Sequence, residues 1–336
     1  MRNSLVAATA VLALTLPASA KDEPKGAPSP NEIVAEAAAE EWVAIPAEDM
    51  LVMTLAPDAD GNPREVVIQL MPAPFSQGWV ENIRTLARAH WYDGISVNRV
   101  QDNYVVQWGD PGYDNPESGE TETKPLPEGL NVMGEDDYTT RVPVKLISPD
   151  IAANFNPIVR DGWRAPILRD AYASSATFEH GWPFALRQYP DKSDRWPVHC
   201  YGMVGVGRNY SPDTGSGAEL YTVIGHAPRH LDRNIALVGR IISGMEHLSS
   251  LPRGSGVLGF YTEEEADKRT PILSVRVASD LPEGERPQFE YLSTEGETFA
   301  KYAEARANRR DPFFIVPAGG ADICNIPVPI RAVASE

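Results

Sequence analysis

The sequence predicts an all-β fold, either a barrel or a sandwich, with few helices. Short runs rich in β-branched and aromatic residues recur along the chain, and Gly, Pro, Asn and Asp separate them. Few segments have the 3.6-residue spacing of an amphipathic helix. The 336 residues are 42% hydrophobic and 23% charged, a composition that is typical of a globular protein.

The first twenty residues have the three parts of a secretory signal peptide. Arg2 supplies the positive start, residues 5–16 are apolar, and Ala18-Ser19-Ala20 ends in the small-residue pattern that precedes cleavage. An apolar run of about a dozen residues is too short for the roughly 30 Å of hydrocarbon in a bilayer, and no later stretch reaches the ~18 residues of a spanning helix. We therefore expect export to the periplasm or the medium, cleavage after Ala20 and no membrane insertion.

Charge and cysteine content narrow the partners and the covalent chemistry. Lys and Arg number 30 against 47 Asp and Glu, a net charge of −17. This argues against a nucleic-acid-binding surface, because phosphates require clustered basic residues. Cys200 and Cys324 are the only cysteines. Because both stand alone in an exported chain, we predict a disulfide between them; the alternative is two buried thiols.

The mature chain begins with a leader at 21–48. It contains a short Ala/Glu-rich helix at 31–41, which Asn31 is expected to cap. Two β-rich runs follow at 50–56 and 65–70, on either side of the sequence Pro-Asp-Ala-Asp-Gly-Asn-Pro. This strong turn signal predicts a β-hairpin.

A helix is predicted at 76–90, because apolar residues recur there at helical spacing. Its apolar face consists of Trp79, Val80, Ile83, Leu86, Ala87 and His90. Further β-rich runs predict strands at 95–100, 104–108, 201–206, 219–224, 236–242 and 272–278. Towards the C-terminus we expect a helical turn at 244–251, an amphipathic helix at 295–310 and an extended, Pro-rich tail at 313–331.

Residues 111–197 differ in composition from the rest of the chain and are predicted to be an insertion. The stretch is rich in Pro, Gly and acidic residues and has little periodicity. It also carries more large aromatic residues than a disordered tether would hold, among them Trp163, Phe178, Trp182, Phe184 and Trp196. We therefore expect an ordered lobe, part of which packs on the core.

No motif for phosphate-binding, zinc-protease or serine-hydrolase chemistry is present. His226 and His230 have the spacing of a metal-binding pair on a helix, but Pro228 between them favours a loop. Ser216 lies between two glycines, and no base is near it in the sequence to activate it. We therefore expect neither a metal nor a cofactor.

The strongest functional signal comes from two segments on either side of the insertion. The first contains Tyr92-Asp93-Gly94, Asn98-Arg99 and Val105-Val106-Gln107-Trp108-Gly109-Asp110. The second contains Gly202 to Arg208, Gly215 to Tyr221, Leu231-Asp232 and Val238 to Met245. In this order they resemble the signature of the cyclophilins, the peptidyl-prolyl cis-trans isomerases. That signature runs from a Tyr-Asp-Gly turn through Phe-His-Arg and Phe-Met-x-Gln-Gly-Gly-Asp to Gly-Ser-Gln-Phe-Phe, Leu-Asp and Gly-Met.

The resemblance implies an eight-stranded antiparallel barrel closed by two helices. It would occupy residues 49–280 with the insertion 111–197 inside it, and residues 281–336 would form a C-terminal extension. The resemblance also implies that the protein binds proline-containing polypeptides, in this case exported clients. Envelope proteins are further candidate partners, although no feature of the sequence identifies one.

Matched position by position, Arg99 falls on the catalytic arginine of the family and Gln107 on the glutamine that supports it. The positions that form the walls of the family's proline pocket correspond to Tyr104, Val105, Tyr221 and Leu231. The position that contacts the substrate backbone corresponds to Gly207. The sequence departs from the family at Asn98 for His, Trp108 for Gly, Glu219 for Gln, His230 for Trp and Ile235 for the pocket His.

Two classes of function remain. Rotation about a prolyl bond has a barrier of about 18–20 kcal/mol because the C–N bond is partly double. A fixed guanidinium beside an apolar socket lowers it without covalent chemistry, by stabilising the twisted amide. The first class is therefore an isomerase that acts through Arg99. The second is a cyclophilin-like binding or scaffold protein, because Glu219, His230 and Ile235 alter the pocket. The alternative to a site is purely structural: Arg99 would be a plain surface residue, and Tyr104 and Tyr221 would be core aromatics.

Overall fold

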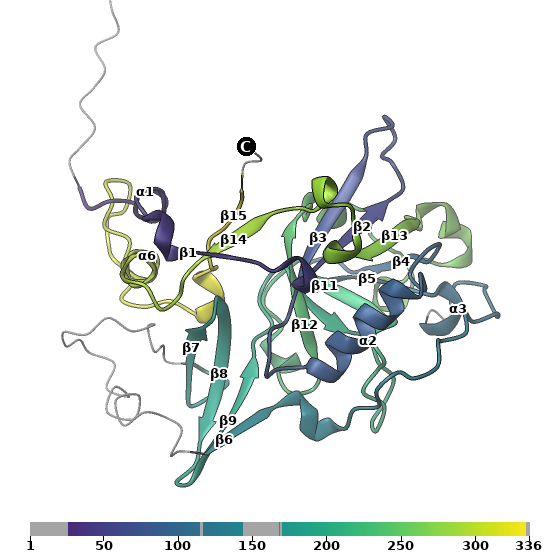
Figure 1. Ribbon diagram of the computed structural model, residues 1–336, viewed down its shortest axis with the longest axis horizontal. Helices are drawn as coiled ribbons and strands as arrows, with labels where there is room; N and C mark the ends of the chain where they lie inside the picture. Colours follow the sequence, from purple (N-terminus) through teal and green to yellow (C-terminus); the bar gives the residue numbers. More distant parts are fainter. Residues whose placement is uncertain (1–25, 115–116, 144–167, 169, 334–336) are drawn as a thin grey trace, which may run out of the picture.

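The computed structural model describes residues 26–114, 117–143, 168 and 170–333. Its strands form three antiparallel sheets of eight, four and three strands (Figure 1). The predicted signal peptide, at 1–20, and Trp163 lie outside the described residues. Among those described, no helix is both long enough and apolar enough to cross a bilayer.

The eight-stranded sheet curls into a nearly closed barrel and confirms the predicted fold. All eight predicted strands are present, with the order β13-β2-β3-β12-β10-β11-β5-β4. Their bounds are β2 Met50–Leu55, β3 Arg64–Leu70, β4 Ser96–Val100, β5 Val105–Gly109, β10 Met203–Val206, β11 Leu220–Val223, β12 Leu237–Ser243 and β13 Ile272–Val277. The two edges meet at a bridge between Ser96 and Pro271, where the Ile272 amide donates to the Ile95 carbonyl at 2.8 Å.

Helix α2, Gln77–Arg88, packs its apolar face on the barrel (Figure 1). Trp79 and Ile83 on this face are fully buried, as the spacing predicts. His90 does not belong to that face, because the helix ends at Arg88 and His90 is an exposed residue with a φ of 55°. The second closing helix that the resemblance implies is reduced to a single turn, α5 Glu246–Ser249.

The N-terminal helix is shorter than predicted and starts earlier. Helix α1 spans Pro30–Ala35, and its cap is Ser29 rather than Asn31. The Ser29 hydroxyl accepts from the Glu32 amide at 3.3 Å, and the Glu32 carboxylate accepts from the Ser29 amide at 2.7 Å. This capping box, with Pro30 at the first helical position, fixes the start of the helix. The rest of the predicted helix contains only a 3-10 turn, Ala39–Glu41.

The described part of the insertion builds a four-stranded sheet beside the barrel (Figure 1). After the short helix α3 Pro111–Asp114, its strands are β6 Thr140–Pro143, β7 Ser175–Glu179, β8 Trp182–Gln188 and β9 Lys192–Pro197. We call residues 140–143, 168 and 170–197 the lobe. Phe178, Trp182, Phe184 and Trp196 are all buried. Phe184 stacks on Phe75, which precedes α2, with ring centroids 4.1 Å apart, so the lobe shares the hydrophobic core of the barrel.

The two ends of the chain pair with each other. Strands β1 Trp42–Ala44, β14 Phe289–Leu292 and β15 Ile330–Ala332 form the third sheet, and α1 packs on α6 Glu297–Ala307. Sequence periodicity missed these strands, because three or four residues carry too little alternation to detect. The predicted disulfide between Cys200 and Cys324 is confirmed, with Cα atoms 5.1 Å apart, and it fastens this C-terminal segment to the barrel.

Candidate active site

Strand register brings the main predicted site residues into one row across the barrel wall. Arg99 on β4 lies opposite Gln107 on β5, Gln107 lies opposite Tyr221 on β11, and Tyr221 lies opposite Gly205 on β10. Opposed residues of neighbouring strands present their side chains on the same face of a sheet. The arginine, the glutamine and the tyrosine therefore face one surface region, although residues 107 and 221 are far apart in the sequence.

A β-bulge selects which residue of β4 joins that row. The pairing of β4 with β5 shifts between Val97 and Arg99, so that Asn98 has no opposite partner. Asn98 is buried and donates from Nδ2 to the Gly109 carbonyl at 3.0 Å. A bulge adds one residue and re-aims the next side chain, which here places Arg99 opposite Gln107. The departures at Asn98 and Trp108 consequently lie in the interior of the barrel, away from the cleft.

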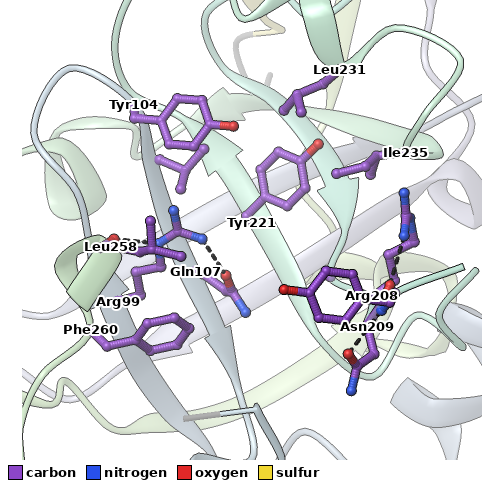
Figure 2. A pocket seen from close by; sticks show the side chains of 13 residues that line it. Arg99, Tyr104, Gln107, Arg208, Asn209, Tyr221, Leu231, Ile235, Leu258 and Phe260 are labelled. Carbon is purple, nitrogen blue, oxygen red and sulfur yellow. Dashed lines mark hydrogen bonds between the residues drawn. The ribbon is translucent and has the colours of Figure 1, made fainter. Parts of the chain in front are cut away.

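This row forms the floor of a cleft of about 570 Å³, a volume that is ordinary for a small-ligand site. Figure 2 shows the side chains that converge on it. Eight of the ten predicted site residues line it, namely Arg99, Tyr104, Val105, Gln107, Gly207, Tyr221, Leu231 and Ile235. Tyr104, Leu231 and Ile235 pack around Val105 and Tyr221, so one end of the cleft is an apolar socket. Arg99 lies at the edge of this socket, beside Tyr104.

The Arg99 guanidinium is held in a fixed orientation. Its Nε donates to the Leu258 carbonyl at 2.7 Å, and Nη1 donates to Gln107 Oε1 at 3.2 Å. The guanidinium lies 5.4 Å from the ring centroid of Phe260 and 5.6 Å from that of Tyr104, which is within cation–π range. Arg99 is neither a free surface arginine nor a core residue; its planar cation borders the apolar socket (Figure 2).

Two residues that were expected in the pocket do not line it. Glu219 is buried behind the cleft, where its carboxylate accepts from the Asp110 amide at 2.8 Å. A Cβ atom at Gly109 would lie 1.7 Å from a Glu219 carboxylate oxygen, so Glu219 occupies space that a glycine leaves open. His230 is exposed and stacks on Tyr104, with centroids 6.3 Å apart. Both residues therefore lie next to residues that line the cleft and not in the cleft itself.

Five lining residues were not predicted. Arg208, Asn209 and Tyr210 directly follow Gly207 in an irregular segment, so their position next to a predicted contact was an available signal. Leu258 and Phe260 had no such signal. They lie about 160 residues beyond Arg99 and reach the site because an antiparallel bridge joins Phe260 to Arg99.

Behind the pocket wall lies a buried chain of polar groups that the sequence did not indicate. The Tyr221 hydroxyl is 2.8 Å from His199 Nε2, and His199 Nδ1 is 2.9 Å from Asp232 Oδ1. Arg229 Nε donates to Asp232 Oδ2 at 2.7 Å. Burial lowers the pKa of His199, although the hydrogen bond that the ring donates to Asp232 acts in the opposite direction. Burial would raise the pKa of Asp232, but its contacts with His199 and Arg229 lower it overall.

The lowered pKa of His199 predicts that the protein loses stability on acidification. A histidine in the unfolded chain has a pKa of about 6.5. The contribution of the neutral buried ring to the free energy of unfolding is therefore fully present above that pH, and it declines as the pH falls below it. The groups that face the ring are Asp232, Arg229, His230 and Tyr221. We expect the thermal unfolding midpoint to fall between pH 7.5 and pH 5.5, and to fall less in His199→Gln. An equal decline in both proteins would contradict the assignment to His199.

Truncation of the socket should weaken substrate binding. Tyr104→Ala removes one aromatic wall, and ~1–1.5 kcal/mol of aromatic contact corresponds to about a tenfold rise in KM. We expect kcat to change much less, because Arg99 keeps its bonds to Leu258 and Gln107. Tyr201→Ala, at a half-exposed tyrosine outside the lining, is the matched control. A loss confined to kcat would show that Tyr104 does not act as a wall.

The fold and the cleft together define the class of protein. An antiparallel barrel presents a fixed arginine next to an apolar socket in a cleft on one side of its wall. The class is therefore an antiparallel β-barrel protein with a surface cleft that combines a fixed cation with an apolar socket.

The comparisons with known proteins agree with this class. A family model described as cyclophilin type peptidyl-prolyl cis-trans isomerase/CLD matches residues 62–277. The chain therefore belongs to the family of cyclophilin-type peptidyl-prolyl cis-trans isomerases, enzymes that interconvert the cis and trans forms of prolyl bonds. No curated protein matches it.

A solved structure supports the same fold. The crystal structure of a cyclophilin from Hirschia baltica is similar, with a TM-score of 0.61 and 21% identity, and the match covers 91% of this chain and 98% of that one. A cyclophilin type isomerase from Cryptosporidium parvum matches with a TM-score of 0.36 and 10% identity, over 68% of this chain and 96% of its own.

Proposed function

We propose that this protein is exported and isomerises X-Pro bonds of exported polypeptides, with Arg99 as the group that stabilises the twisted amide. The observation that carries the proposal is the fixed guanidinium at the edge of the apolar socket, held by Leu258 and Gln107. Membership of the family supports isomerase activity in general. The signal-peptide pattern at 1–20 supports export.

The chemistry requires a cation at one place. When the prolyl C–N bond twists, the nitrogen lone pair leaves resonance and becomes able to accept a hydrogen bond. A guanidinium that already points at this position stabilises the twisted state more than the planar one, and only such a difference accelerates the reaction. Gln107, through its Oε1, keeps the Arg99 plane in orientation.

The apolar socket supplies the second requirement, which is to hold one side of the rotating bond. Val105, Tyr221, Leu231 and Ile235 present a mostly apolar surface to the ring. Ile235 stands where the family has a histidine, so the ring meets a hydrocarbon there instead of a polar group. While the socket holds the proline, the residue that precedes it is free to rotate.

Activity is tested with purified protein and chromogenic Ala-X-Pro-Phe anilides that vary the residue before proline. We expect catalysed cis-to-trans conversion above the uncatalysed rate. If no peptide is converted, the enzyme proposal fails, and the alternative of a peptide-binding or scaffold protein takes its place. That alternative rests on the altered positions Glu219, His230 and Ile235, and it predicts that the same peptides bind without turnover.

Export is tested independently of activity. We expect protein from the cell envelope or the medium to begin at Lys21 when its N-terminus is sequenced. Protein that keeps Met1, or that fractionates with integral membrane proteins, would contradict export. Deletion of residues 2–20 is the control, and it should leave the product in the cytoplasm.

A further inference from the structure

The pocket wall is connected to the lobe by an unbroken chain of buried polar side chains. Tyr221, whose ring lines the cleft (Figure 2), contacts His199, which contacts Asp232. Arg229 follows, and it donates to both oxygens of Asp170, at 2.8 and 3.1 Å. All five of these side chains are at most a few per cent exposed.

The direction of each hydrogen bond is fixed by chemistry. A carboxylate can only accept, so His199 Nδ1 carries the proton that Asp232 receives. Nε2 of a neutral imidazole is then an acceptor, and the Tyr221 hydroxyl donates to it. Asp232 also accepts from the backbone amide of His199 at 3.0 Å, so the histidine is held at two points.

The barrel leaves room for this hydroxyl at one glycine. A Cβ atom at Gly205, the residue opposite Tyr221, would lie 2.3 Å from the tyrosine oxygen. The same Cβ atom would lie 2.4 Å from the ring carbon that carries the hydroxyl, so Gly205 leaves room for the ring as well as for its oxygen. His199, whose Nε2 lies 2.8 Å from the hydroxyl, is therefore the feature that favours a tyrosine over a phenylalanine at position 221.

We propose that His199 is a positioning residue for the proline socket: it holds the Tyr221 ring by its hydroxyl, and the lobe holds His199 through Asp170, Arg229 and Asp232. The proposal rests on the proposed isomerase function and assigns a role to the insertion, which supplies Asp170. Because the side chains are packed and buried, a shift at Asp170 has a direct mechanical route to the socket.

The proposal predicts a loss of substrate affinity, whereas the rate of the catalytic step should change little. Without its hydrogen bond, the Tyr221 ring gains freedom that peptide binding must then remove. Arg99 is held by its own bonds to Leu258 and Gln107, neither of which uses the Tyr221 hydroxyl, so we expect it to keep its orientation. We therefore expect KM, and the Kd of a non-hydrolysed Ala-Ala-Pro-Phe amide, to rise about fivefold in Tyr221→Phe, the effect of one typical hydrogen bond, with kcat nearly unchanged.

Two substitutions at His199 separate positioning from simple structural support. The amide of His199→Gln reaches the Nε2 position and can accept from Tyr221, whereas that of His199→Asn stays near Nδ1 and can only serve Asp232. Each variant breaks one of the two buried bonds, so both should lower the unfolding midpoint. We expect Kd and KM to rise in His199→Asn and to stay near wild type in His199→Gln.

A double-mutant cycle completes the test. In Tyr221→Phe the hydroxyl is already gone, so adding His199→Asn should not raise Kd further. Equal Kd in the Asn and Gln variants, or additive effects in the double variant, would overturn the proposal. Because Kd is measured without turnover, these outcomes remain decisive even if the wild-type protein proves inactive, which would refute only the isomerase function.

Discussion

Arg99→Ala is expected to reduce kcat/KM on a prolyl peptide by about 10²–10³-fold, the usual effect of removing one preorganised donor. The loss should fall on kcat, because the socket that binds the ring keeps Val105, Tyr221 and Leu231. The free energy of unfolding should change by about 1 kcal/mol or less, since Arg99 is only half-buried and its partners are not ionised. Exchange NMR on the peptide and urea unfolding measure the two quantities.

Arg99→Lys is the sharper variant. It keeps the charge, but an ammonium lacks the planar fork that bonds Leu258 and Gln107 together, so it should not restore activity. Arg253→Ala is the matched control, because this arginine pairs with the exposed Asp102 and lies outside the cleft lining. If Arg99→Ala is as active as wild type, the site is assigned wrongly even though the fold is right.

Loss of the disulfide between Cys200 and Cys324 should have the largest effect on stability. The bridge closes a loop with a sequence separation of 124. Loops of this length are expected to contribute about 4.7 kcal/mol by restricting the unfolded chain, and removal of native bridges costs roughly 2–5 kcal/mol. We expect the Cys200→Ala/Cys324→Ala protein to lose free energy of unfolding in this range, a large share of a typical domain's total.

The reduced wild-type protein provides the control for this prediction. Reductant should lower the urea midpoint of the wild type towards that of the double variant and leave the variant unchanged. The bridge itself is checked by intact mass under denaturing, non-reducing conditions. Uptake of two alkyl groups without reductant would show that the bridge is absent, and the predicted stability difference would then not arise.

The strands and the site motifs could be predicted from the sequence because both are local signals. The β-rich, mostly apolar runs of β2 and β12 are encoded in six or seven consecutive residues, and the barrel strands were located to within two residues. Arg99, Tyr104 and Gln107 belong to one short motif and enter the cleft together. The cap of α1 was misplaced by two residues, since Ser29 and Asn31 have similar capping ability and only the contact with Glu32 decides between them.

Tertiary structure alone decided the parts of the site that depend on distant partners. Leu258 reaches Arg99, and His199 reaches Tyr221, through contacts that no local period encodes. Likewise, β1, β14 and β15 are too short to show a pattern, and they become strands only because they pair with each other. A residue's own neighbours set its preference for helix or strand, whereas its hydrogen-bond partner depends on which segments the closed barrel brings together. For that reason the barrel strands and the place of Arg99 in the site could be predicted from the sequence, whereas the contacts that hold them in place depend on the tertiary structure.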